Sequence, residues 1–109
     1  MWSLTRATRV YLRSGPTDLR LGFDGLSAIV RTQLGQDVLS GHLFVFCNRS
    51  RTRVKVLLFD GSGLWLCQKR LEKGTFRWPR SGDEEVEPAA LHALLTGLET
   101  EPRRNWFRR

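Results

Sequence analysis

The fold of this 109-residue chain is decided by the stretch Arg53-Val54-Lys55-Val56-Leu57-Leu58-Phe59-Asp60-Gly61-Ser62-Gly63-Leu64. Its first seven residues are rich in bulky and β-branched side chains, which is typical of a strand. Asp60 and the glycines that follow it tolerate positive φ angles and therefore indicate a tight hairpin connection. The stretch predicts a strand over 53–59 and a return strand over 64–71.

Two neighbouring runs extend this hairpin. The run Leu43-Phe44-Val45-Phe46 is bulky and prone to β structure, and the run Thr75-Phe76-Arg77-Trp78 follows a tight turn at Glu72-Lys73-Gly74. Pro79 cannot donate to a strand ladder, so we expect the last strand to end there. The segment 43–78 is therefore predicted to be an antiparallel meander of four strands.

Apolar residues at helical spacing predict two helices, over 22–34 and 88–98. Gly35 stands where a glycine commonly ends a helix, and Pro88 suits a first helical turn. Either Asp18 or Asp24 could cap the first helix.

Three segments complete the prediction. They are a short strand of uncertain position at 8–12, a polar surface loop at 81–87 and a basic tail at 100–109. We therefore expect an α+β fold, with a meander of about four to five strands and both helices packed on one face. The length suits a single domain, over 1–99.

The composition excludes several protein classes. No apolar run approaches the roughly 20 residues of a membrane-spanning helix, and the first residues lack the apolar stretch of a signal peptide, so a cytoplasmic protein without membrane contact is expected. Cys47 and Cys67 each lie inside an apolar run, which favours two buried thiols. A disulfide between two strands remains the alternative.

Positive charge is concentrated in the middle of the chain. The net charge is +7, and the segment 49–80 holds nine basic and two acidic residues, so it accounts for an excess equal to that of the whole chain. The basic residues are Arg49, Arg51, Arg53, Lys55, Lys69, Arg70, Lys73, Arg77 and Arg80. A positive field of this kind favours a polyanion, and nucleic acid is the commonest polyanion in the cytoplasm.

Strand periodicity suggests how these charges are displayed. Arg51, Arg53 and Lys55 would share one face of a strand, with a spacing of about 6.6 to 6.8 Å that is close to the phosphate spacing of a nucleic-acid strand. The opposite, apolar face would pack on the helices and leave the cationic face in water. The predicted DNA-binding residues are Arg49, Arg51, Arg53, Lys55, Lys69, Arg70, Lys73 and Arg77. The alternative is a solvated basic face without a ligand.

Three aromatic residues lie among these charges. Trp65, Phe76 and Trp78 could stack on unpaired bases if their side chains were exposed. Large aromatic side chains dominate the cores of small domains, so Phe76 and Trp78 are expected to be buried. For Trp65 both interpretations remain open.

Metal, cofactor and catalytic sites are not expected. The soft metal ligands His42, Cys47, Cys67 and His92 show no metal-site spacing, and the dispersed glycines form no nucleotide-binding motif, so neither a cofactor nor a small-molecule substrate is predicted. The carboxylates of Asp18, Asp24 and Asp60 could in principle form the two-metal cluster of a nuclease. Their positions beside a turn and a helix start are, however, ordinary structural uses of aspartate.

Several separate blocks resemble the small accessory protein of IS66-type insertion sequences, commonly called TnpB. The first is Thr17-Asp18-Leu19-Arg20-Leu21-Gly22-Phe23-Asp24-Gly25-Leu26, and the others cover 41–46, 53–64, 69–79 and 88–98. At Cys67-Gln68 the chain departs from the family, which more often has an aromatic or other residue followed by lysine. The resemblance implies a role in transposition beside a separate transposase that carries the catalytic acids.

Three functions follow as hypotheses. The first is a non-enzymatic accessory protein that binds the DNA at the ends of the element through its basic strand face. The second is an interaction module that binds the transposase without direct contact to DNA. The third, and least favoured, is a metal-dependent nuclease.

Overall fold

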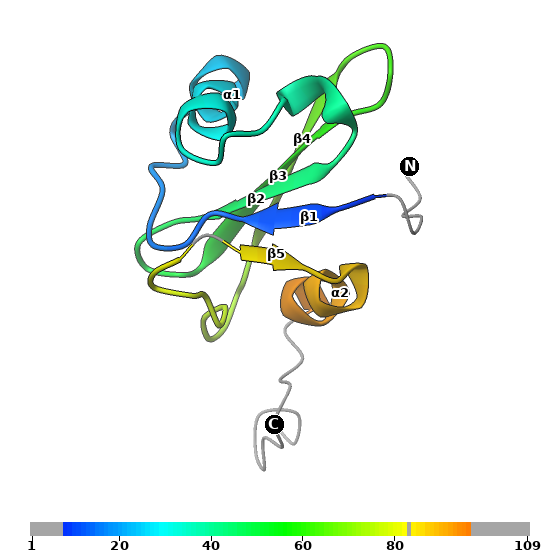
Figure 1. Ribbon diagram of the computed structural model, residues 1–109. Helices are drawn as coiled ribbons and strands as arrows, with labels where there is room; N and C mark the ends of the chain where they lie inside the picture. The colour runs from blue at the N-terminus through cyan, green and yellow to red at the C-terminus, as the bar shows by residue number, and fades with distance from the viewer. Residues whose placement is uncertain (1–7, 83, 97–109) are drawn as a thin grey trace.

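The computed structural model describes residues 8–82 and 84–96, which form one mixed sheet between two helices (Figure 1). The elements, in chain order, are β1 (Val10–Leu12), α1 (Phe23–Thr32), the short 3-10 helix η1 (Val38–Ser40), β2 (Leu43–Cys47), β3 (Arg53–Phe59), β4 (Leu64–Arg70), β5 (Glu84–Val86) and α2 (Pro88–Thr96). The strand order in the sheet is β4-β3-β2-β1-β5. The prediction of an α+β fold with four to five strands and two helices is confirmed.

The hairpin that decides the fold forms as expected. β3 pairs antiparallel with both β2 and β4, with Phe59 opposite Leu64 at the hairpin end. The Asp60 carboxylate accepts hydrogen bonds from the backbone N–H groups of Ser62 and Gly63, both at 2.9 Å, and from the Trp65 indole at 2.6 Å. These hydrogen bonds, that of the Ser62 N–H first, hold the pKa of Asp60 well below its usual value. The aspartate therefore stays ionised and fixes the turn.

The remaining strands differ from the prediction. Residues 75–78 form no strand, because Phe76 donates its N–H to the Arg51 carbonyl at 2.7 Å and turns its side chain into the core. The segment 81–87, predicted as a surface loop, contributes β5, which pairs antiparallel with β1. β1 in turn lies parallel to β2, and α1 connects these two strands. A parallel pair needs such a crossover connection, so β1 and α1 are placed together.

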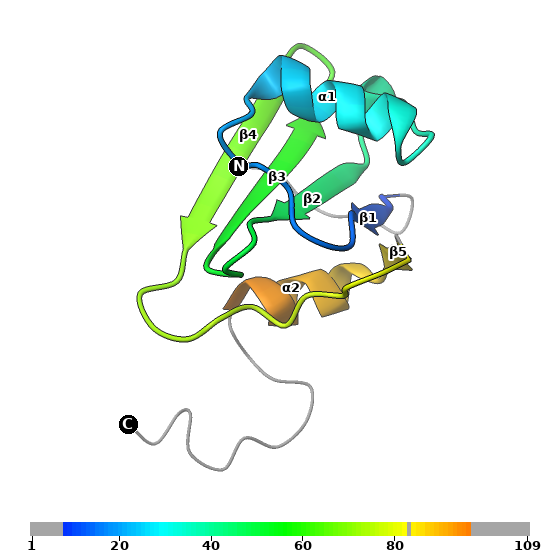
Figure 2. The ribbon, with the colours of Figure 1, turned by 90° about the vertical axis from the view of Figure 1, so that its left-hand side faces the viewer.

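The two helices cover opposite faces of the sheet, so the prediction that both pack on one face is wrong (Figure 2). Alternate residues of β2 point to the two sides. Val45 packs in one core with Leu91 of α2, whereas Phe44 packs in a second core with Leu26 of α1. All five residues of β2 are buried, and such a strand needs a layer on each side.

The helix ends follow from local chemistry. α1 begins after Gly22 without a side-chain cap, so neither Asp18 nor Asp24 fills that role. Gly35 follows the helix in the left-handed conformation, at φ +64°, as glycine does at many helix ends. α2 begins at Pro88 as predicted.

Inside α1, Gly25 lies close to the preceding loop. A Cβ atom at Gly25 would meet Leu21 Cδ2 at 2.8 Å, so this glycine lets the loop approach the helix closely.

The aromatic and sulfur side chains lie largely as predicted. Phe76 and Trp78 are buried, and the Trp78 indole donates to the Arg13 carbonyl at 2.8 Å. Trp65 is 44% exposed on the edge strand. Neither cysteine forms a disulfide: Cys47 is fully buried, and Cys67 is half-buried. Burial raises the pKa of the Cys47 thiol to about 11.

Part of the prediction lies outside the described residues, namely the basic tail at 100–109 and positions 97 and 98 of the second helix. The domain boundary at 99 therefore stays a prediction. Among residues 8–82 and 84–96, no helix is both long and apolar enough to cross a membrane.

The raised pKa of Cys47 predicts a pH-dependent difference in labelling. In the folded protein near pH 8, iodoacetamide should label Cys67 and spare Cys47, because the thiolate is the reactive species and Cys47 is both protonated and shielded. Labelling of Cys47 should speed up about tenfold per pH unit until the pH approaches the pKa of about 11. Mass spectrometry after proteolysis measures both sites. Equal labelling of the two cysteines near pH 8 would show that Cys47 is not shielded.

Candidate nucleic-acid interface

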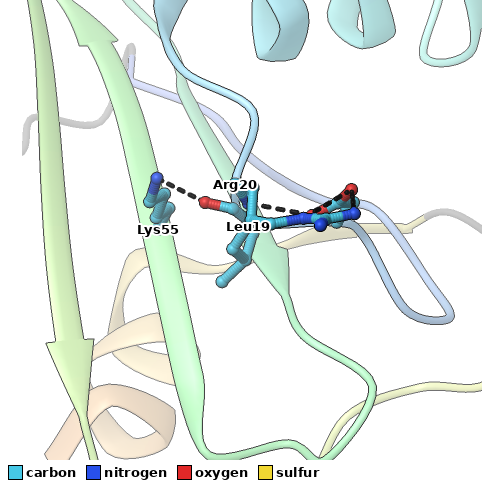
Figure 3. A network of polar contacts seen from close by, with 4 residues as sticks. Leu19, Arg20 and Lys55 are labelled. Carbon is cyan, nitrogen blue, oxygen red and sulfur yellow. Dashed lines mark hydrogen bonds and ion pairs between the residues drawn. The ribbon is translucent and has the colours of Figure 1, made fainter.

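The Lys55 side chain is not part of an exposed row of cations on β3, contrary to the prediction. This half-buried side chain crosses to the loop before α1, where Nζ donates to the carbonyl oxygen of Leu19 at 2.6 Å (Figure 3). Nζ also donates to the carbonyl oxygen of Leu21, at 3.2 Å. The face that carries Lys55 also carries Leu57, which is fully buried under α1. The predicted cationic face is therefore covered from Lys55 onward, whereas Arg53 at its start is exposed, and Lys55 stabilises the fold.

Arg51 is not part of the strand either. It lies in the turn before β3, at φ 59°, and is the only residue other than glycine with a positive φ in the described chain. The Asn48 side chain organises this turn, since its carbonyl oxygen accepts from the N–H groups of Thr52 at 2.9 Å and Arg53 at 3.0 Å. The alternation expected for Arg51, Arg53 and Lys55 is broken by this turn.

Lys69 also has a structural role. It lies on the α2 face of β4, opposite Val54, and its Nζ donates to the carbonyl oxygen of Leu95 in the last turn of α2. A cation at this position suits the negative end of a helix. The ammonium groups of Lys55 and Lys69 are thus both engaged by backbone carbonyl groups of a packed element, so the interface proposed below does not use them.

The other predicted residues gather at one end of the sheet, where three loops meet. The loop at 13–20 is tied to the end of β2 by the hydrogen bond from Thr17 N–H to the Cys47 carbonyl, at 2.8 Å. It is tied to the loop at 71–80 by the hydrogen bond from Gly15 N–H to the Pro79 carbonyl, at 2.9 Å. The turn at 48–52 lies between them. We call this region the basic end, after its arginines Arg20, Arg49, Arg51, Arg53, Arg70 and Arg80; Lys73 and Arg77 flank it in the loop at 71–80.

Two open depressions are hollowed into the basic end. The larger, of about 710 Å³, lies between the loop at 13–20 and the turn at 48–52, and its charged lining residues are Asp18, Arg20, Arg49 and Arg53. The smaller, of about 380 Å³, lies between Arg49, Arg51 and Arg80, with Trp78 in its wall. Arg49 belongs to both, so the two depressions form one continuous cationic surface.

The arginines of this surface differ in whether their guanidinium groups already form an ion pair. Within residues 8–82 and 84–96, the exposed side chains of Arg49, Arg51 and Arg53 form neither an ion pair nor a hydrogen bond. Arg70 pairs with Glu72 at 3.1 Å, an exposed contact that contributes little. Three unengaged guanidinium groups side by side are suited to phosphate, which they can bind bidentately.

Arg20 is the exception, because its guanidinium forks onto Asp18. Nε and Nη2 of Arg20 lie 3.0 and 2.9 Å from the two carboxylate oxygens. This contact lowers the pKa of Asp18 to about 2, so the pair persists at neutral pH. Arg20 therefore contributes a partly neutralised cation at the margin of the larger depression.

The opposite end of the sheet carries acids. Asp37 precedes η1, Asp60 closes the β3–β4 hairpin, and Glu87 follows β5, all near the strand ends that face away from the basic end. Arg9 is also at this end, and it pairs with Glu85 at 3.5 Å. These acids lie away from the basic end, whereas Asp18 and Glu72 lie at the basic end itself and pair with its Arg20 and Arg70.

The residues considered for metal chemistry are not brought together. In the described part of the chain, no group of three or more histidine, cysteine, aspartate or glutamate side chains could hold a metal ion. Asp60 and Asp18 are occupied by hydrogen bonds at opposite ends of the sheet. The aspartate cluster considered for a nuclease does not form.

Two cations of the basic end, Arg20 and Arg80, were absent from the sequence-based prediction. Their loops reach the turn at 48–52 only because β1 lies parallel to β2, so that both strands end at the same side. A sequence signal was present only for the central turn, where Asn48 and its polar neighbours favour a loop rather than a strand.

Comparisons with known proteins agree with the resemblance described above. The family described as IS66 Orf2 like protein matches residues 8–105. The uncharacterized protein y4hO of Sinorhizobium fredii is 41% identical over 101 residues, which cover 90% of this chain and 88% of the relative. A second uncharacterized protein of that organism, y4jC, is 34% identical over 97 residues, covering 87% and 83%. No solved structure matches. The chain belongs to the IS66 Orf2-like family of insertion-sequence proteins.

Proposed function

We propose that this protein is a non-catalytic accessory factor for transposition, which binds the DNA at the ends of its insertion sequence through the basic end of the sheet. The observation that carries the proposal is the cluster of three unengaged arginines, Arg49, Arg51 and Arg53, beside two connected depressions. Family membership supplies the context of transposition. The protein would act in the cytoplasm, next to the separate transposase.

The shape of the surface favours a phosphate backbone over a small ligand. The depressions are open and cationic, whereas small-molecule pockets enclose most of the ligand in an apolar wall. Contacts from arginine to phosphate position a protein on DNA without reading sequence. Acids at the opposite end of the sheet would orient the molecule, because they are repelled by DNA while the arginines are attracted.

A backbone outlier points to the same place. Arg51 adopts a left-handed conformation that costs a residue with a Cβ atom on the order of 1 kcal/mol, and asparagine or glycine would fit there at lower cost. A residue held in such a conformation often serves a function. The side chain of Arg51 lines the smaller depression, so the strained turn presents a cation to the proposed ligand.

Removing two of these cations should weaken DNA binding. The double variant Arg49→Gln/Arg53→Gln loses two phosphate contacts, so affinity for a short duplex should fall on the order of tenfold at low salt, and the log–log salt slope should shrink by about two. Fluorescence anisotropy across a salt titration measures both quantities. The matched control Arg9→Gln/Arg31→Gln removes the same charge elsewhere and should change affinity much less.

Equal effects of the two double variants would mean that only net charge matters. Binding by Arg49→Gln/Arg53→Gln that equals wild type would remove the basic end as the interface. Binding to the transposase without DNA would then be the function to test, by a pull-down after nuclease treatment.

Arg51→Asn should lower DNA affinity without lowering the stability of the fold. Asparagine tolerates the left-handed conformation, so the midpoint of thermal unfolding should stay level or rise. DNA affinity should nevertheless fall, and the salt slope should shrink by about one. A variant that lost stability and kept its affinity would contradict both the strain and the contact assigned to Arg51.

Lys55→Met should lower the stability of the fold without lowering DNA affinity. It leaves the carbonyl groups of Leu19 and Leu21 without their donor, which should reduce the free energy of unfolding by about 1–3 kcal/mol. DNA affinity of the folded protein should stay within about twofold of wild type, because the Lys55 ammonium is engaged by the loop before α1. Chemical denaturation and anisotropy measure the two effects. A large loss of affinity with unchanged stability would restore Lys55 to the DNA-binding face.

A further inference from the structure

β4 forms one edge of the sheet, and no described segment pairs with its outer side. Hydrogen bonds from Asp60 N–H to the Gly63 carbonyl, at 3.0 Å, and from Leu71 N–H to the Thr52 carbonyl, at 2.8 Å, bracket its ladder with β3. Because antiparallel ladders alternate, the residues at 65, 67 and 69 direct their backbone groups inward to β3. The outward backbone groups belong to Leu64, Leu66, Gln68 and Arg70.

Two features that usually prevent strand addition, a bulge and a proline, are absent from β4. All seven residues of β4 stand opposite successive residues of β3, so the edge is regular and without a bulge. Its hairpin half is apolar, and Trp65 there is 44% exposed with its indole pinned to Asp60. Its charges lie at the other half, where Lys69 is engaged by α2. A regular, partly apolar edge of this length is suited to pairing with another strand.

We propose that β4 pairs antiparallel with β4 of a second copy of this chain, centred on Cys67. In this register Leu64 lies opposite Arg70 of the second copy, and Leu66 lies opposite Gln68, so all outward backbone groups of both strands meet. Trp65 lies opposite Lys69, so the exposed indole meets the alkyl part of a side chain whose ammonium stays on the Leu95 carbonyl. No two like charges stand directly opposite one another.

Charge favours this antiparallel arrangement over a parallel one. β4 begins at the hairpin that holds Asp60 and ends at Arg70 of the basic end. An antiparallel pair brings the acidic hairpin of one copy to the cationic strand end of the other, whereas a parallel pair would set the two Arg70 side chains together. Opposite charges across strands stabilise a pair and like charges destabilise it.

The proposed dimer has a consequence for DNA binding. This consequence rests on the proposed function, whereas the pairing of the two strands does not rest on it. The two strands would run in opposite directions, so the two basic ends would point away from each other across a continuous sheet. One dimer would then offer a cationic surface to each of two DNA segments.

Cys67 provides the test, because it would meet its own copy at the centre of the register. That position is a non-hydrogen-bonded pair with Cα atoms about 4.5 Å apart, which is within the range of a disulfide. In a Cys47→Ala background, diamide should oxidise the two thiols to one disulfide; each thiol gives up a proton and an electron, and diamide is reduced to the hydrazine. The matched collision control is Ser40→Cys in Cys47→Ala/Cys67→Ala, since Ser40 is exposed outside β4.

The expected result is a disulfide-linked dimer that forms at least about tenfold faster through Cys67 than through the control thiol, on nuclease-treated protein without DNA. Sedimentation of the wild-type protein from about 1 µM to about 1 mM should show a reversible dimer. Gln68→Pro should abolish it without unfolding the chain, because the Gln68 N–H points away from β3, whereas Gln68→Thr should retain it.

A wild-type protein that stays monomeric over this range overturns the proposal, and so does equal crosslinking through the two thiols. A dimer that survives Gln68→Pro in a folded variant places the interface elsewhere and also overturns it. None of these readouts involves DNA, so their failure would leave the proposed function standing, and loss of DNA binding would leave the dimer standing.

Discussion

The burial of β2 on both faces is the constraint on which the rest of the structure depends. Its five residues, Leu43-Phe44-Val45-Phe46-Cys47, are all apolar, and all are removed from solvent. A sheet with such a central strand must be covered on both sides, and one helix cannot do that. α1 therefore packs on one face and α2 on the other, although both helices carry ordinary apolar stripes that do not encode which face they cover.

This constraint explains why the lysine of the central hairpin is structural. With α1 over the face that holds Leu57, the Lys55 side chain is half-buried on that face, and an ammonium there without a hydrogen-bond partner would be costly. The chain satisfies it with the carbonyl groups of Leu19 and Leu21, which belong to the loop that leads into α1. A cation in β3 thus fixes the loop whose next residues form the covering helix.

Features that depend on neighbouring residues could be predicted from the sequence, whereas the pairing of segments far apart in the chain could not. The hairpin at Asp60, the start of α2 at Pro88 and the burial of Phe76 and Trp78 each depend on a few neighbouring residues or on size and hydrophobicity. The parallel pairing of β1 with β2 depends on residues more than thirty positions apart. The proposed site has the same limit: Arg49, Arg51 and Arg53 were predicted from the sequence to share a surface, but the surface they line lies at the ends of strands and not on one strand face. The unbroken apolar run of β2 was the available signal against an open face.

Covering both faces leaves a sheet with two kinds of exposed surface, its ends and its edges. The strand ends carry the charge, because loops can hold arginines without burying them, and the basic end gathers those of three loops. The edge at β4 carries exposed backbone groups and an exposed tryptophan, which are features of strand pairing and not of phosphate binding. The two surfaces differ in chemistry, and Arg70 is the residue that they share, because it belongs to the basic end and is the last residue of β4. If both proposals hold, a three-layer domain of this size contacts a polyanion at its strand ends and a second protein chain at its edge.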